Sequence, residues 1–370
     1  MRKRNAVRAV AAALAAMMAL TACGGGGGNE TTAAAGGDTG STAAGGDAAA
    51  SGSGEVGKTD ITFAMGADIV TLDPAGQQDT TTSVIIKHVY STLLDISDEG
   101  ELVPDLAESY ELVNDTDFVF KLREDAVWSD GTPVTANDVK FTFDRAKNMP
   151  KTKSNTSKVK EVVVDNEHQV TIKLTEPYAP FKSIVANSNL SIVQEAAVTA
   201  AGEAYGDADN AVGSGPFTVK EWVPNDHYTL EKNANYWGEE PITTSITCRV
   251  IPEGSARAIA LETGEVDLVW NVDPTDCSNI EANSDVKLLS QPSSSIEYLG
   301  MNVTKEHFKD QKVRQAINYA IDKQALVDTI VEGRGTVANS YINNTIPGWT
   351  DEVEAYPYDP EKAKELMAEA

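Results

Sequence analysis

The chain has 370 residues, 41% of them hydrophobic, and a formal net charge of −26 at pH 7. This acidity argues against nucleic acid and anionic membrane surfaces as partners, because both repel a polyanion. Three cysteines in a chain of this length exclude a disulfide-dense scaffold.

The N-terminus has the pattern of an export signal. Basic residues precede the apolar run Ala9–Leu20, namely Arg2, Lys3, Arg4 and Arg8. This run is shorter than the ~20 residues that a helix needs to span a bilayer. A basic head before a short apolar core is typical of a signal peptide. We therefore expect residues 1–22 to be removed, which changes the formal charge from −26 to −30.

Residues 20–24 read Leu-Thr-Ala-Cys-Gly and resemble the lipobox of bacterial lipoproteins. The resemblance implies that the Cys23 sulfur is diacylated, which anchors the protein on the outer, extracytoplasmic or periplasmic face of the cell membrane. The alternative is a secreted protein with an incidental cysteine. Residues 23–57 are rich in Gly, Ala, Ser and Thr and contain no aromatic residue. They are predicted to form a flexible tether, because no core can form there.

A folded part is predicted from residue 58 onward, with a length that suffices for two or more domains. Its first elements are a predicted strand at 61–65 and a helix at 81–90. The next are a strand at 118–122, a turn at Asp130-Gly131, a helix from Thr135 to Ala146 with Asp138 in its capping box, and a hairpin of 162–164 with 170–174. Strands and helices are mixed along the chain, and antiparallel strand pairs occur among them. This pattern predicts a mixed α/β fold with α+β character.

Helical spacing of apolar residues returns near the end of the chain. One stripe consists of Val313, Ala316, Ile317, Ala320 and Ile321. Asp322 is the predicted cap of a second helix, which Gly333 ends, and Asp359-Pro360 opens a last helix. The chain stops at Ala370 inside this helix, whose apolar face is expected to lack a partner within the chain, as in a fragment.

Several stretches match one protein family in order. They are Leu72–Ala75, Trp128–Val139, Gly213–Phe217, Leu230–Trp237, Gly264–Leu268, and Val313–Ile317 with Ala320–Asp322. Together they resemble the family 5 extracytoplasmic solute-binding proteins of bacterial ABC importers. The resemblance covers about residues 60–370, and the order of the motifs makes it specific.

The resemblance implies a two-lobed clamp of the periplasmic-binding-protein type with three domains. Residues 58–90 and 194–293 form a discontinuous domain I, and residues 91–193 form an inserted domain II. Residues 294–370 are the start of domain III, so that the C-terminal lobe is truncated.

The resemblance also implies a function. Members of the family enclose a solute between two lobes by hinge closure, and a membrane permease with its ATPase accepts the closed form. The best-known members bind oligopeptides or dipeptides, so a peptide is the expected solute. Nickel, haem, opine and oligosaccharide are the alternatives. The resemblance implies a monomer without a cofactor or a resident metal.

Ligand-contacting positions of the family match, by local motif, Gln78, Asp79, Thr80, Trp270, Ser295 and Tyr298. The flat ring of Trp270 suits a cleft wall, and a core tryptophan is the alternative. Tyr298 lies in segment 293–303, which is predicted to be a strand crossing between the lobes; an ordinary strand residue is its alternative. For Gln78, Asp79 and Thr80, which are predicted to lie in a loop, the alternative is plain solvation.

The recognition motifs themselves have structural explanations and are not assigned to the site. Trp128–Val139 is predicted to be a strand, a tight turn and a capped helix. Gly213 and Gly215 are predicted to adopt unusual backbone angles beside Pro216, and Trp237 is a predicted core residue. Two further cysteines, Cys248 and Cys277, are expected to be buried thiols, with a disulfide between them as the alternative.

A secreted hydrolase and a structural surface lipoprotein are the rival functions. The histidines are scattered at His88, His168, His227 and His307, and the sequence contains no nucleophile elbow or metalloprotease motif. A structural lipoprotein leaves the ordered family motifs unexplained. We therefore predict a binding protein and not an enzyme.

Overall fold

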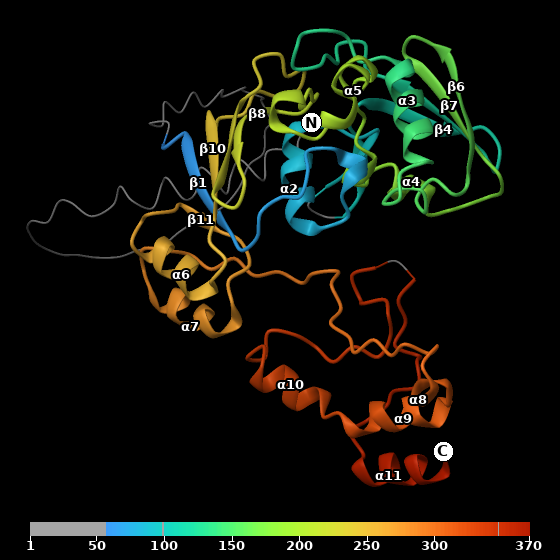
Figure 1. Cartoon of the computed structure of the whole chain (residues 1–370), viewed down its shortest axis with the longest axis vertical. Coiled ribbons are helices and arrows are strands. Elements are labelled where there is room, and N and C mark those ends of the chain that lie inside the picture. The colour runs from blue at the N-terminus through green and yellow to red at the C-terminus, as the bar shows by residue number, and fades with distance from the viewer. Residues whose placement is uncertain (1–56, 98–99, 347) are drawn as a thin grey trace, which may run out of the picture. The chain divides into compact units, whose positions relative to one another are not determined.

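The computed structural model describes residues 57–97, 100–346 and 348–370 (Figure 1). The predicted signal peptide, Cys23 and nearly all of the tether lie outside these residues. The described chain divides into two compact units. The first contains the residues up to Ile61 and Asp68–Cys248, and the second contains Thr62–Ala67 and Arg249–Ala370. No described helix of either unit is long and apolar enough to cross a bilayer.

Among the described residues, strands form three sheets with the orders β11-β1-β10-β9-β8, β2-β3 and β4-β5-β7-β6. The strands are β1 (Asp60–Met65), β2 (Leu94–Ile96), β3 (Leu102–Pro104), β4 (Ala107–Leu112), β5 (Asp117–Leu122), β6 (Val159–Asn166), β7 (Gln169–Leu174), β8 (Phe217–Val223), β9 (His227–Lys232), β10 (Ser245–Val250) and β11 (Leu268–Val269). The predicted strands at 61–65 and 118–122 and the predicted hairpin are confirmed.

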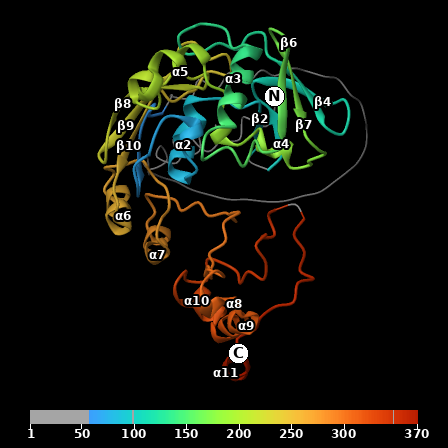
Figure 2. The same cartoon turned by 45° about the vertical axis from the view of Figure 1, so that its right-hand side comes forward.

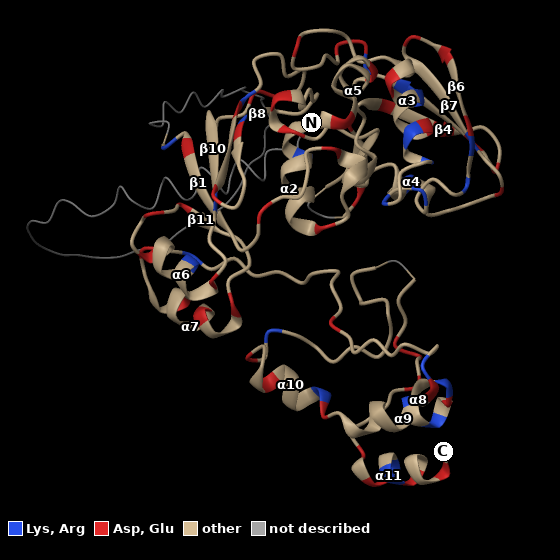
Figure 3. Cartoon of the chain, in the orientation of Figure 1, with Lys and Arg blue, Asp and Glu red and all other residues tan. Residues whose placement is uncertain are grey.

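Helices connect these strands. The α-helices are α2 (Thr80–Val89), α3 (Ala136–Ala146), α4 (Phe181–Ile184), α5 (Glu195–Ala201), α6 (Gly254–Glu262), α7 (Pro274–Ala282), α8 (Glu306–Lys309), α9 (Gln311–Ala320), α10 (Lys323–Thr329) and α11 (Pro360–Glu369). The 3₁₀ turns are η1 (Pro74–Gly76), η2 (Ser188–Leu190), η3 (Gly202–Ala204) and η4 (Ala208–Asn210). Asp and Glu residues are spread over helices, strands and loops of both units (Figure 3).

The main core of the first unit lies where α3 covers the antiparallel sheet β4-β5-β7-β6 (Figure 2). Phe120 of β5 and Phe143 of α3 are fully buried there together with Trp128. Trp237 packs against this core as a partly buried residue, and its indole Nε1 donates to the Ser214 carbonyl at 3.0 Å. These contacts bear out the structural explanation of the Trp128 and Trp237 motifs.

The turn and the helix start that follow Trp128 form as predicted. Gly131 has a φ of +84°, which suits a glycine in a tight turn. Thr135 and Asp138 form the capping box of α3, in which Asp138 Oδ2 accepts from the Thr135 backbone N–H at 3.0 Å. Asp138 Oδ1 also accepts from the Glu195 backbone N–H at 3.1 Å. The same carboxylate therefore begins α3 and holds the start of α5.

The prediction of unusual backbone angles at Gly213 and Gly215 is wrong. Neither residue is among those with positive φ. Both lie instead against the C-terminal end of α2, where the Gly215 N–H donates to the Val89 carbonyl at 2.8 Å. A Cβ on Gly213 would stand 1.9 Å from that same oxygen, and one on Gly215 would stand 2.6 Å from the His88 oxygen. These positions need glycine because two backbone segments approach closely.

The second unit contains the parallel pair β1 and β11, with Phe63 opposite Leu268. Ala64, Ala260 and Val266 form a small buried cluster that holds α6 on this pair. Small side chains at these positions allow the helix to approach the strands closely. The result is a β1-α6-β11 layer in which β11 ends directly before Trp270.

The C-terminal helices of the second unit begin at the predicted caps. The Asp322 side chain accepts from the Ala325 N–H, and the Asp359 side chain accepts from the Lys362 N–H. α10 ends at Thr329, before Gly333, whose φ is +74°. The expectation that the last helix lacks a partner is wrong, because α11 packs on α9. Their contact buries Ala316 on α9 and two residues of α11, Ala363 and Leu366.

The two cysteines of the described chain are buried free thiols, as predicted. Burial raises the pKa of the Cys248 thiol to about 12 and also raises the pKa of Cys277. Because thiolates are the reactive species, we expect both thiols of a Cys23→Ser protein to react slowly with a thiol reagent in the native state and rapidly in guanidinium chloride. A thiol that reacts stoichiometrically within seconds in the native protein, or an absence of thiols after denaturation, contradicts this prediction.

Candidate functional site

An open hollow of about 440 Å³ lies in the first unit beside the N-terminus of α2. Side-chain amides provide most of its polar lining, and we call it the amide hollow. Its lining residues are Gln77, Gln78, Asp79, Thr80, Ser83, Asn155, Asn187 and Asn189. Hollows that hold small molecules measure ~300–1,000 Å³. The amide hollow is therefore large enough for part of a small solute.

Two anchored points hold the loop Gln77–Thr80, which forms one wall of the amide hollow. Before the loop, the buried Asp73 caps η1 and accepts from the Arg145 guanidinium at 2.8 and 2.6 Å. Near its end, Asp79 Oδ1 accepts from the Thr82 N–H at 2.7 Å and so caps α2. The Leu72-Asp73-Pro74 motif thus fixes the start of the loop.

The opposite wall consists of three asparagines. Asn187 begins η2, where its Oδ1 accepts from the Asn189 backbone N–H at 3.2 Å. Asn155 comes from the turn after α3, and its Nδ2 donates to Asn189 Oδ1 at 3.1 Å. Asn189 is only 5% exposed. A tertiary hydrogen bond therefore fixes Asn155 and Asn189, and a local one fixes Asn187 at the start of η2.

A chain of side-chain hydrogen bonds connects the two walls. The Ser188 hydroxyl of η2 donates to the Ser83 hydroxyl of α2 at 3.0 Å. Ser83 in turn lies 3.2 Å from Oε1 of Gln77, which is fully buried. This network stiffens the amide hollow, because it connects η2 to α2 and to the Gln77 side chain through paired polar groups.

The structure brings together three of the predicted site residues, since Gln78, Asp79 and Thr80 all line the amide hollow. The side chains of Gln78 and Thr80 are exposed, and Asp79 is half-buried. The Gln78 amide donates to the Lys151 carbonyl, which ties the loop to the turn after α3.

Trp270 belongs to the second unit and is half-buried, so it is not a fully enclosed core residue. Its backbone N–H donates to the Ala64 carbonyl at 3.1 Å, which fixes it at the end of β11. The following Asn271 has a φ of +58°. The Arg257 guanidinium, only 5% exposed, donates to the Asn271 carbonyl at 3.0 Å and to the Ile251 carbonyl at 2.9 Å. Arg257 therefore holds the turn that carries Trp270.

Ser295 and Tyr298 are exposed residues of the second unit, and 78% of Tyr298 is accessible. The prediction that segment 293–303 is a strand is wrong, because the structure has irregular backbone there. A strand needs a neighbour to satisfy its backbone N–H and C=O groups. None of the strands formed by the described residues pairs with this segment.

Reasoning from sequence missed the three asparagines, and also the amide and the hydroxyl that contact Ser188. These residues are Gln77, Ser83, Asn155, Asn187 and Asn189. One local signal was present at 187–189, where Asn-Ser-Asn interrupts apolar residues on both sides. Asparagine is favoured at caps and turns because its side chain bonds to nearby backbone.

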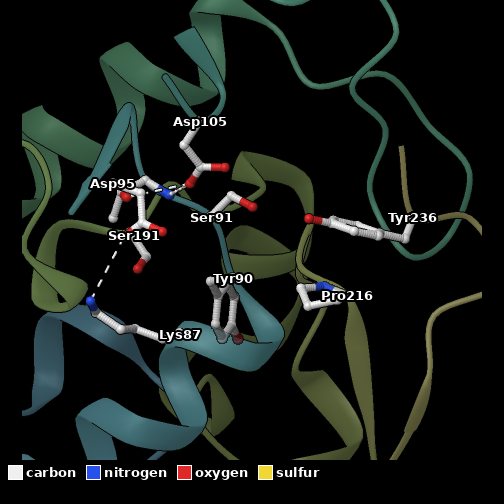
Figure 4. Close-up of a pocket in the computed structure, with 9 residues that line it drawn as sticks. Lys87, Tyr90, Ser91, Asp95, Asp105, Ser191, Pro216 and Tyr236 are labelled. Carbon is white, nitrogen blue, oxygen red and sulfur yellow. Dashed lines mark hydrogen bonds and ion pairs between the residues drawn. The ribbon is translucent and has the colours of Figure 1, made fainter. Parts of the chain in front are cut away.

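A second, smaller hollow of about 100 Å³ lies in the first unit near the C-terminal end of α2 (Figure 4). The buried Asp105 accepts there from the Thr92 N–H at 2.8 Å, and Lys87 lies 3.7 Å from Asp95. This hollow is below the size range of small-molecule sites. The amide hollow is the better candidate site.

Comparison with known proteins identifies the relatives of the chain. The family model of the bacterial extracellular solute-binding proteins, family 5 (middle part), matches residues 101–370. The glutathione-binding protein GsiB of Shigella dysenteriae serotype 1 is 33% identical over 316 residues, which cover 84% of this chain and 61% of that protein.

Solved structures give the same result. The periplasmic binding protein DppA of Helicobacter pylori, in complex with the peptide STSA, superposes with a TM-score of 0.75 at 26% identity over 84% of this chain and 65% of that one. The oligopeptide-binding protein AppA of Bacillus subtilis, in complex with a nonapeptide, gives 0.76 at 26% identity over 84% and 63%. The predicted mixed α/β fold of the periplasmic-binding-protein type is confirmed. The chain spans about three fifths of the length of these relatives.

Proposed function

Because the chain belongs to the bacterial extracellular solute-binding proteins of family 5, we propose that it is the solute-binding component of an ABC importer and captures peptides. The amide hollow carries this proposal, since its neutral donors and acceptors suit the groups that every peptide presents. The names of similar proteins agree with such a solute: GsiB is called glutathione-binding, and DppA and AppA were solved with peptides.

The proposed mechanism encloses the peptide between two lobes. Domain I (58–90 and 194–293) with domain II (91–193) forms one lobe, and domain III begins at residue 294. Gln78, Asp79 and Thr80 contribute hydrogen bonds, and the Trp270 ring provides a flat apolar wall. Ser295 and Tyr298 contact the ligand from the connecting segment. Hinge closure then presents the loaded form to a permease and its ATPase.

Lipid on Cys23 supports this role by holding the protein near its permease. We propose that residues 1–22 are removed and that residues 23–57 act as a tether on the outer face of the membrane, extracytoplasmic or periplasmic. The protein works as a monomer and turns over no substrate. The tether allows the binding units to reach both free solute and the permease.

Native mass spectrometry of the Cys23→Ser protein tests the proposal. We expect short peptides from the host to co-purify and to be released on denaturation. Co-purified nickel, haem, opine or oligosaccharide would keep the importer role and replace the peptide. An empty protein that shows no thermal shift with a peptide and metal panel contradicts solute binding and favours a structural lipoprotein. Release of cleaved products from added peptides would favour the hydrolase.

A further inference from the structure

We propose that Asn155, Asn187 and Asn189 form a subsite that selects an uncharged amide group of the solute over a charged one. The inference rests on the proposed capture of peptides and adds to it the chemistry of one recognition point. Two sources provide this group, the backbone peptide unit and the carboxamide of an Asn or Gln side chain.

The first evidence is the state of the asparagine amides. Asn189 Oδ1 is occupied by Asn155 and its backbone N–H by Asn187, whereas its Nδ2 has no partner among the described residues. Asn187 Oδ1 is likewise occupied and its Nδ2 is free within the described chain. Asn189 is 5% exposed, yet its Nδ2 is not one of the fully buried unpaired atoms of the described chain, so this donor stays accessible from the hollow that the residue lines. A carbonyl of the solute satisfies it.

The amide hollow also offers acceptors. Gln78 uses its Nε2 on Lys151 and keeps Oε1 available within the described residues. Asn155 Oδ1 accepts from the Ser154 hydroxyl at 3.3 Å, which leaves its second lone pair for another donor. Donors and acceptors therefore line the same space. An amide, with one C=O and at least one N–H, is the ligand group that uses both.

The charge of the lining distinguishes an amide from a charged group. Among the described residues, no Lys, Arg or His lines the amide hollow, so a carboxylate finds no cation among them. Asp79 is the one charged lining residue in the part of the chain that the structure describes, and its carboxylate caps the positive end of the α2 dipole. This contact offsets part of its charge, because the N-terminal end of a helix carries roughly +0.5 elementary charge, and so it weakens the attraction for an ammonium group. The free-energy cost of leaving water for such a site is lowest for a neutral group.

Binding of matched tripeptides by isothermal titration calorimetry tests the proposal. The probes place Gln, Glu, Lys or Met at each position of an otherwise alanine tripeptide. If the subsite binds a side-chain carboxamide, we expect the natural protein to bind one Gln peptide about tenfold more tightly than its Glu and Lys counterparts. If it binds the backbone peptide unit, Asn189→Ala is expected to lower the affinity for all tripeptides equally, by about tenfold.

Asn189→Asp is the sharpest variant, because it keeps the acceptor that Asn155 uses and replaces the free donor by an acceptor. We expect this variant to lose affinity for an amide and to gain affinity for a Lys peptide. Asn155→Ala provides a second test on the same wall, because it removes the amide that donates to Asn189 Oδ1. Asn148→Ala, an exposed asparagine at the end of α3 that does not line the hollow, is the control and is expected to bind like the natural protein.

Thermal unfolding of each variant separates loss of binding from loss of fold. The inference is overturned if folded Asn189→Ala and Asn189→Asp bind all probes as the natural protein does, or if Glu or Lys peptides bind best to the natural protein. In either case the proposed peptide capture stands. Absence of binding by every tripeptide, and of co-purified peptides, overturns peptide capture and the subsite together.

Discussion

Arg145→Met is expected to lower the free energy of unfolding by about 3 kcal/mol. The guanidinium bonds to both oxygens of Asp73, whose side chain is 7% exposed. It also lies over the Tyr205 ring, 5.4 Å from the centroid. Methionine fills a similar volume but leaves the Asp73 carboxylate buried without its cation. An uncompensated buried charge accounts for most of the free-energy cost of breaking a buried pair. Urea denaturation followed by circular dichroism measures the change.

An exposed ion pair of the same unit provides the control. Lys121 lies 3.1 Å from Glu108, and both side chains are about half exposed. Lys121→Met is therefore expected to change the free energy of unfolding by less than about 0.5 kcal/mol. Adding Asp73→Asn to Arg145→Met is expected to recover part of the loss, since asparagine can still cap η1 without a charge. If Arg145→Met costs no more than Lys121→Met, the buried pair does not stabilise the fold.

Features that depend on contacts within a few residues of the chain could be predicted from the sequence. The capping box of Thr135 and Asp138, and the caps Asp322 and Asp359, each connect a side chain to a backbone group three positions away or fewer. Such contacts form in any fold that contains the helix. The hairpin of β6 and β7 was readable for the same reason, since its turn and its alternation are adjacent.

The candidate site was only partly readable, because its two walls come from distant parts of the chain. Asn155 and Asn189 are 34 positions apart, and Gln77 and Ser188 are 111 apart. No local pattern shows that such residues meet. The family resemblance placed Gln78, Asp79 and Thr80 at a ligand site, and the structure places them on one hollow. The opposite wall emerged only from the tertiary fold.

The errors also come from tertiary context. The family resemblance predicts a crossing strand at 293–303, yet a strand forms only where another strand pairs with it. An apolar stripe in the last helix does not reveal that α9 will cover it. A glycine in sequence can signal a positive φ or a close approach, and only the fold distinguishes the two. Gly213 is a case of close approach between backbone segments, without a positive φ.

Gly213→Ala is expected to destabilise the protein by at least about 3 kcal/mol. Its Cβ would stand 1.9 Å from the Val89 oxygen and 2.8 Å from the Val89 carbonyl carbon. Backbone atoms cannot swing aside as a flexible side chain can. The C-terminal end of α2 must therefore move, which breaks the hydrogen bond from the Gly215 N–H to the Val89 carbonyl. The same denaturation assay measures the loss.

Two further glycines separate crowding from backbone strain. Gly264 has a φ of +74° and open space around it, so Gly264→Ala tests strain alone and is expected to cost about 1 kcal/mol. Gly335 has neither a positive φ nor a contact closer than 3.5 Å, so Gly335→Ala is expected to change stability by less than about 0.5 kcal/mol. A Gly213→Ala protein as stable as Gly335→Ala would show that α2 can yield to the methyl group. The close packing of residues 213–215 on α2 would then not explain why this motif requires glycine.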